Sequence, residues 1–141
     1  ENMFFGTKTA LASYNIESGY VNWIKNINTT NSPIINLNNL FVITDNGFFI
    51  NLQKDSGEII WSTNILKILK RKKQNTKITG FILGSNKIYA TTLNGYLIIS
   101  SATTGKVESF KKIGDPIYAP PIIHDGSLFI LTQNSRIFGL N

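Results

Sequence analysis

A fixed spacing between glycine and tryptophan recurs along the chain and constrains its fold more than any other feature. Gly19 is followed by Trp23, and Gly57 is followed by Trp61 at the same offset. Each of these glycines follows a serine, and a similar turn occurs a third time at Thr104-Gly105. The glycines lie 38 and then 48 positions apart. Repetition at this period indicates an architecture in which each unit buries its apolar surface against its neighbours.

Each unit between these marks consists of short apolar segments separated by turn residues. The strands expected from this pattern are 33–36, 40–44, 48–53 and 58–63, then 79–83, 87–92, 96–101 and 106–111, then 119–124, 127–132 and 136–140. The first unit begins near residues 3–5 and lacks an opening strand. Four short antiparallel strands about every 40 residues are typical of a β-propeller blade.

We therefore predict an all-β fold, a β-propeller of four-stranded antiparallel blades that fills residues 1–141 as a single segment. About four blades are expected, two of them incomplete. The repeats span about 1–27, 28–65, 77–113 and 114–141, with an insertion between blades at 64–77. Incomplete blades leave open edges, which invite pairing. We expect either a segment of a larger propeller or self-association through the open blade edges, with a closed ring of four blades as the alternative.

The best copy of the repeat runs from Gly47 to Trp61 and has the pattern Asn-Gly, apolar strand, Ser-Gly, three residues, Trp. This pattern resembles the PQQ-like repeat of eight-bladed propellers, and the resemblance covers nearly the whole chain. The sequence departs from the family at Ser109, where tryptophan is expected, and at Gln53 and Ser101, where aspartate is common.

The resemblance implies two functional branches. Quinoprotein dehydrogenases bind pyrroloquinoline quinone and calcium in the central channel, whereas BamB-like lipoproteins are non-catalytic scaffolds of outer-membrane β-barrel assembly. We expect the second: a protein-binding scaffold of the bacterial cell envelope, in the periplasm or on the periplasmic face of the outer membrane. Its expected partner is a protein, with a β-barrel assembly component as the candidate. A fragment of a quinoprotein dehydrogenase is the alternative.

Few residues are suited to catalysis, so we expect no enzyme, no cofactor and no metal site. The chain has no cysteine and one histidine. His124 precedes the Asp125-Gly126 turn and is interpreted as a turn residue. No Asp-x-Asp or Asp-x-Asn cluster offers the oxygen ligands that calcium needs. No glycine-rich loop leads from a strand into a helix, so nucleotide binding is unsupported.

Positive charge is concentrated in the insertion between two repeats. The net charge of +6 comes from 14 basic and 8 acidic residues. Outside the insertion, bases and acids are equal in number, so the high isoelectric point is expected to be a local property. The six bases of the insertion are Lys67, Lys70, Arg71, Lys72, Lys73 and Lys77.

The insertion is the predicted partner-binding segment, as a short amphipathic helix or a projecting loop. Long basic connections bind acidic proteins or anionic membrane surfaces. Nucleic acid is not expected as a partner, because no aromatic side chains interleave with the lysines to stack on bases. The alternative is a solvated loop whose Ile and Leu side chains pack onto a blade. The candidate contact residues are Ile65, Leu66, Lys67, Lys70, Arg71, Lys72 and Lys73.

Overall fold

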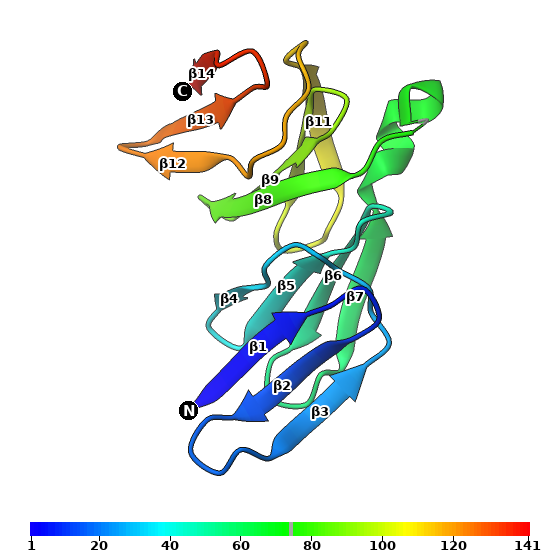
Figure 1. Ribbon diagram of the computed structural model, residues 1–141, viewed down its shortest axis with the longest axis vertical. Helices are drawn as coiled ribbons and strands as arrows, with labels where there is room; N and C mark the ends of the chain where they lie inside the picture. The colour runs from blue at the N-terminus through cyan, green and yellow to red at the C-terminus, as the bar shows by residue number, and fades with distance from the viewer. Residues whose placement is uncertain (74) are drawn as a thin grey trace.

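Four antiparallel sheets succeed one another along the chain in a computed structural model that describes residues 1–73 and 75–141. Figure 1 shows them stacked from bottom to top, with both chain ends on the left. The sheets are β1 (Asn2–Gly6), β2 (Leu11–Asn15), β3 (Val21–Lys25); β4 (Ile34–Asn36), β5 (Asn39–Ile43), β6 (Phe48–Gln53), β7 (Ile59–Asn64); β8 (Ile78–Gly84), β9 (Lys87–Thr92), β10 (Tyr96–Ser101), β11 (Val107–Lys112); and β12 (Ile122–His124), β13 (Ser127–Leu131), β14 (Ile137–Leu140). We call them blades 1 to 4.

The predicted fold class is confirmed. The blades have three, four, four and three strands, and within the described residues each blade pairs its strands only with one another. One expected strand is shorter than predicted: the segment 119–124 pairs from Ile122 onward. Pro120 and Pro121 lack the N–H groups that a strand ladder needs, so the strand starts after them.

A β-bulge lies at the same place in three blades and shows which of their residues are equivalent. Between the last two strands of each blade the register shifts directly after the pairs Ser13–Trp23, Asn51–Trp61 and Ile99–Ser109. Ser109 therefore occupies the tryptophan position of blade 3, and its neighbour Phe110 points elsewhere on the strand. The departure from tryptophan at Ser109 is therefore a true substitution, and Phe110 is not the equivalent aromatic shifted by one position.

The first tryptophan joins blade 1 to blade 2. The Trp23 indole is buried, and its Nε1 donates a hydrogen bond to the carbonyl oxygen of Lys54 at 2.9 Å. A Cβ built on Gly57 would lie 2.6 Å from the indole ring. Gly57 also has a positive φ of 70°, so the turn needs glycine for its conformation and for the close approach of the ring.

The second tryptophan repeats the contact between blades 2 and 3. Trp61 Nε1 donates to the carbonyl oxygen of Thr103 at 3.0 Å, and a Cβ on Gly105 would lie 2.5 Å from the ring. Both tryptophans thus fill the gap between neighbouring blades. Each contact joins apolar burial to a directional hydrogen bond across the interface.

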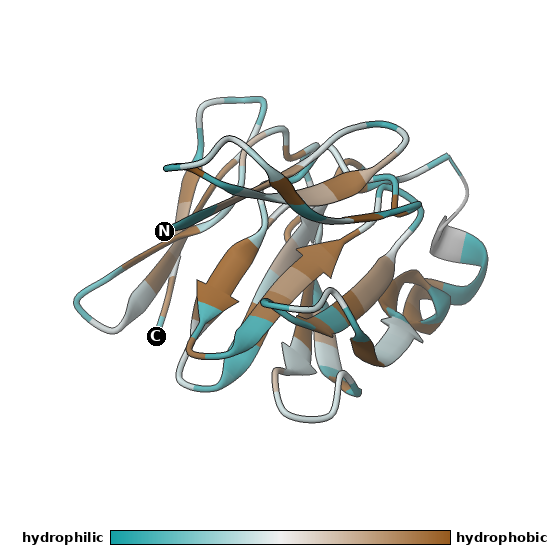
Figure 2. Cartoon of the chain, turned by 90° about the horizontal axis from the view of Figure 1, so that it is seen from below, coloured by the Kyte–Doolittle hydropathy of each residue, from teal (hydrophilic) through white to brown (hydrophobic). Residues whose placement is uncertain are grey.

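The core consists of three layers, one in each gap between successive blades. Alternate residues of a strand face opposite neighbours: Leu40 and Val42 face blade 1, whereas Phe41 and Ile43 face blade 3. Leu97, Ile117, Leu128 and Ile130 form the layer between blades 3 and 4. Figure 2 shows apolar residues concentrated on the strands and polar residues along the turns. This period of two is the pattern of strands buried on both faces.

The equivalent positions Gly19 and Gly57 allow the tryptophan contact to be tested. Both have a similar φ, 73° and 70°, but nothing lies within 4 Å of a Cβ on Gly19. We expect Gly19→Ala to lower the free energy of unfolding by about 1–2 kcal/mol, the cost of a left-handed alanine. Gly57→Ala should cost about 1–3 kcal/mol more, because the Trp23 ring must move. Urea unfolding measures both, and equal losses would show that the ring contact does not matter.

Candidate partner-binding segment

The basic insertion forms a helix that connects blade 2 to blade 3. This 3-10 helix, η1 (Ile65–Lys73), follows β7 directly. The Asn64 side chain accepts a hydrogen bond from the Leu66 N–H at 3.1 Å, as an N-cap does. The Ile65 N–H donates to the Gly47 carbonyl at 2.8 Å. Lys70 has a φ of 51° and interrupts the helical geometry. The helix is thus tied at its start to the turn before β6.

One side of η1 is part of the core between blades 2 and 3. Ile65, Leu66 and Leu69 are 0%, 5% and 1% exposed and pack in the same layer as Phe49 and Ile78. Burying each of these side chains is worth about 1.5–3 kcal/mol. Two of the predicted contact residues, Ile65 and Leu66, are therefore covered by the blades and anchor the helix.

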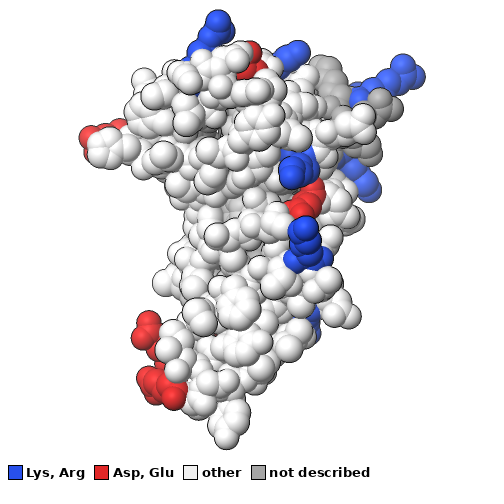
Figure 3. Space-filling view, viewed as in Figure 1, with Lys and Arg blue, Asp and Glu red and all other residues white. Residues whose placement is uncertain are grey.

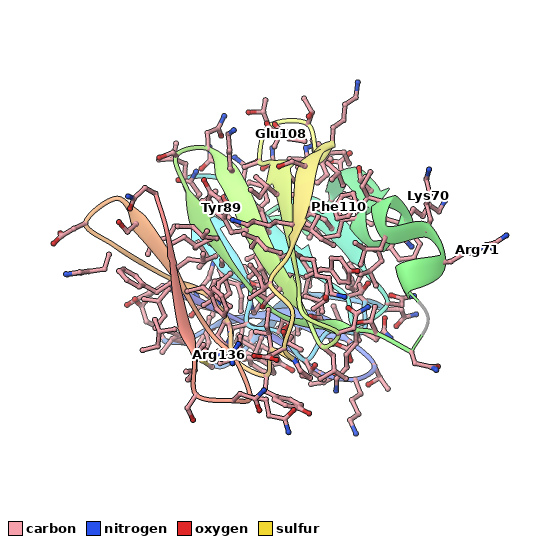
Figure 4. The ribbon with its side chains drawn as sticks, turned by 90° about the horizontal axis from the view of Figure 1, so that it is seen from above. Lys70, Arg71, Tyr89, Glu108, Phe110 and Arg136 are labelled. Atoms are coloured by element: carbon pink, nitrogen blue, oxygen red, sulfur yellow. The ribbon has the colours of Figure 1, made fainter. Side chains whose placement is uncertain are left out.

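The other side of η1 faces outward. Lys67, Ile68, Lys70 and Arg71 are exposed, and Figure 4 shows Lys70 and Arg71 pointing away from the sheets. Among the described residues, no ion pair joins Lys67, Lys70 or Arg71 to a carboxylate. The side chains of the predicted residues Lys72 and Lys73 lie outside the described part of the structure. The exposed bases of η1 are thus available to an anionic partner.

Two further bases lie on a neighbouring strand that the sequence did not connect to the insertion. Lys111 and Lys112 are exposed at the end of β11, and β11 packs against η1. Lys112 Nζ lies 6.0 Å from the centre of the Tyr96 ring. No signal in the sequence brings positions 67–71 and 111–112 together, because the strand pairing that places them is long-range.

Several other charged groups of the described residues form ion pairs at the surface. His124 Nε2 lies 3.2 Å from Asp125 Oδ2, and both side chains are exposed. Lys87 Nζ lies 2.7 Å from Glu108 Oε2, and this hydrogen bond, followed by the carboxylate charge, raises the pKa of Lys87. Within the described residues, no three His, Cys, Asp or Glu side chains come together as metal ligands would. The same residues contain no helix that is long and apolar enough to cross a membrane.

Comparison with known proteins agrees with this architecture. Residues 2–63 match the family model described as outer membrane protein assembly factor BamB. The crystal structure of BamB from Moraxella catarrhalis superposes with a TM-score of 0.76 at 11% identity, over 93% of this chain and 37% of that one. The computationally designed Ika4 protein superposes with a TM-score of 0.73 at 11% identity, over 99% of this chain and 84% of that one.

A dehydrogenase has the same fold. The quinohemoprotein alcohol dehydrogenase from Comamonas testosteroni superposes with a TM-score of 0.67 at 14% identity, over 79% of this chain and 19% of that one. A search of curated protein sequences found no match. The chain spans less than two fifths of the Moraxella catarrhalis protein and about a fifth of the dehydrogenase. The chain has the fold of about four β-propeller blades, and its residues 2–63 resemble the family of the outer membrane protein assembly factor BamB.

Proposed function

We propose that the chain is a non-catalytic scaffold that binds a protein partner in the bacterial cell envelope, as part of outer-membrane protein assembly. The observation that carries the proposal is the match of residues 2–63 to the BamB family model. The compartment that follows from this likeness is the periplasm or the periplasmic face of the outer membrane. The partner that follows from it is a component of the β-barrel assembly machinery.

The exposed side of η1 is the contact that we infer for this partner. A scaffold must present its binding groups at fixed positions, because freezing a mobile segment on binding costs free energy. Ile65, Leu66 and Leu69 hold the helix in the core, while Lys67, Lys70 and Arg71 extend into solvent. Charges on such a fixed base select and steer an acidic partner surface.

The contact can be tested with two variants that change the net charge equally. In the first, Lys67, Lys70 and Arg71 are replaced by Gln. In the second, Lys54, Lys87 and Lys106, which lie far from η1 along the blades, are replaced by Gln. In a pull-down from native envelope extract with mass identification, wild type and the second variant should retain a β-barrel assembly component. The first variant should lose most of it and keep its melting temperature. Equal retention by all three proteins would contradict the contact.

The quinoprotein alternative is supported by the likeness to the Comamonas testosteroni enzyme. Calcium in proteins takes six to eight oxygen ligands, and the described residues bring no three acids together. The residues present do not fit the ion, so we derive no cofactor step. We expect pyrroloquinoline quinone with calcium to leave the melting temperature unchanged. A rise that grows with cofactor concentration would favour the dehydrogenase branch over the scaffold.

We also infer that the uncovered faces of blades 1 and 4 pair with each other in a second copy of the chain. Met3 and Phe5 of blade 1 occupy the positions of Leu40 and Val42, which are buried against the preceding blade. On blade 4, the equivalents of Ile34, Phe41 and Ile43 face outward. They are Ile122, Phe129 and Leu131.

These faces have the composition of the buried layers but are open to solvent. Met3 and Phe5 are 49% and 39% exposed, whereas Ile122 and Leu131 are 62% and 50% exposed. The open face of blade 4 corresponds to the face that blade 2 packs against blade 3. The open face of blade 1 corresponds to the face that blade 2 packs against blade 1. Head-to-tail pairing of two copies would repeat the internal interface twice and cover both faces.

Sedimentation velocity tests this pairing. We expect wild type to sediment as a dimer, and the double variant Leu131→Asn, Ile137→Asn to sediment as a monomer, because both side chains lie on the open face of blade 4. Leu37→Asn is the matched control: Leu37 is 82% exposed but lies in the turn between β4 and β5. A monomeric wild type would contradict the pairing.

A further inference from the structure

The antiparallel topology sorts the connections of the propeller into two ends. At the first, which we call the linker end, lie the turns 7–10, 44–47, 93–95 and 132–136 together with the connections between blades at 26–33, 64–77 and 113–121. Backbone hydrogen bonds join turns and connections there: Thr29 N–H to Thr7 O at 2.9 Å, Leu93 N–H to Lys77 O at 3.0 Å, and Gln133 N–H to Pro116 O at 2.8 Å. Each of the four blades thus contributes a turn or a connection to the linker end.

The opposite end consists, in the described residues, of hairpin turns and the two chain termini. It contains the turns 16–20, 37–38, 54–58, 85–86, 102–106 and 125–126. Lys54 N–H donates to Asn38 O at 3.0 Å, and Ala102 N–H donates to Asn86 O at 3.0 Å. The two ends are separated by the length of the strands, so they present two different surfaces.

Basic residues gather at the linker end. Nine described bases lie in its turns and connections or at the strand residues next to them, against two acids, Asp45 and Asp115. Both acids are half-buried and engaged: Asp45 Oδ1 accepts hydrogen bonds from Thr30, and Asp115 Oδ2 lies 3.9 Å from Arg136. The nine bases are Lys8, Lys25, Lys67, Lys70, Arg71, Lys77, Lys111, Lys112 and Arg136.

The opposite end carries the reverse charge. Six of the eight acids lie there, with three bases, and two of these bases pair with acids: Lys54 with Asp55 at 3.0 Å and Lys87 with Glu108 at 2.7 Å. Figure 3 shows acidic groups without basic neighbours at the left and lower left, whereas acidic groups lie beside basic ones at the top and on the right. The acids are Glu1, Glu17, Asp55, Glu58, Glu108 and Asp125. Charge is therefore distributed unequally between the two ends of the propeller, and the excess of bases is not confined to η1.

Exposed apolar and aromatic side chains stand among the bases of the linker end. Ile68, on η1, is 36% exposed, and Tyr118, on the connection to blade 4, is 62% exposed. Lysine and arginine beside an exposed aliphatic and a tyrosine are suited to the headgroup region of a membrane, where charged heads meet phosphates and apolar groups enter the acyl boundary. A purely acidic protein surface would use the bases but offer nothing to these two side chains.

We propose that the linker end binds an anionic phospholipid surface and orients the propeller on it, with the acidic end facing away. Nine bases on one surface act together, since the attraction to an anionic membrane reaches about 10 Å at moderate salt. The acidic end is repelled by the same membrane, so the chain binds in one orientation. This binding requires no protein partner, and it competes with the proposed protein contact for Lys67, Lys70 and Arg71 of η1.

Vesicle co-sedimentation of the full chain tests the proposal. The probes are vesicles of phosphatidylcholine and vesicles in which about one third of the lipid is phosphatidylglycerol. We expect binding to the anionic vesicles alone, with the affinity falling at least about tenfold as salt rises from about 0.05 to 0.5 M. In the variant Ile68→Cys, a fluorescent probe can be attached to the introduced thiol. Its emission should shift to the blue when the chain binds anionic vesicles, because the site then enters the membrane surface.

Two matched variants separate the linker end from net charge. Replacing Lys8, Lys25 and Lys111 by Gln removes three bases of the linker end outside η1. Replacing Lys54, Lys87 and Lys106 by Gln removes three bases of the opposite end. The first variant should bind anionic vesicles roughly tenfold or more weakly, and the second should bind as wild type does. Equal weakening would show a net-charge effect and overturn the proposal, as would absence of vesicle binding.

The outcomes also distinguish this proposal from the scaffold function. If the linker-end variant loses an acidic protein in a pull-down while wild type fails to bind vesicles, the surface is a protein contact and the membrane proposal is wrong. If wild type binds vesicles but retains no protein, the membrane proposal stands and the scaffold function loses its support.

Discussion

The contact between a tryptophan and the glycine turn of the next blade is the interaction on which the stacking of blades 1, 2 and 3 depends. Successive blades share no strand ladder in the described residues, so side chains and connections set the angle between them. Trp23 and Trp61 each fill a site that a Cβ on Gly57 or Gly105 would close, and each donates a hydrogen bond across the gap. Apolar burial alone is non-directional, and the hydrogen bond adds the missing orientation.

The same layered packing explains how a highly basic segment becomes a fixed surface. The sequence 65–73 is rich in lysine and would be solvated if it stood alone. Three of its four apolar residues, Ile65, Leu66 and Leu69, enter the layer between blades 2 and 3, and the Asn64 cap and the Gly47 carbonyl fix its start. Lys67, Lys70 and Arg71 then face outward from a helix that is anchored in the core. Structure and surface chemistry are linked here because one helix face completes a core while the other presents charge.

The distribution of charge distinguishes one end of the propeller from the other. Each blade runs back and forth between the same two ends, so a base or an acid is assigned to an end by the strand or turn that carries it. Bases outside η1, such as Lys8, Lys25 and Lys111, lie on the same end as the helix, and most acids lie on the other. The balance of eight bases and eight acids outside the insertion, seen in the sequence, therefore conceals two surfaces of opposite charge.

The sequence by itself determined the propeller fold, the three-four-four-three strand pattern and the structural role of the tryptophans, because these depend on local turn chemistry and on a period of two. It also located the basic helix but assigned Ile65 and Leu66 to a partner, since amphipathic periodicity does not tell which neighbour covers the apolar face. Only the tertiary structure decided that blades 2 and 3 cover it, and that Lys111 and Lys112 lie beside it. Contacts between residues far apart in the chain follow from the stacking of whole blades, which no short window of sequence contains.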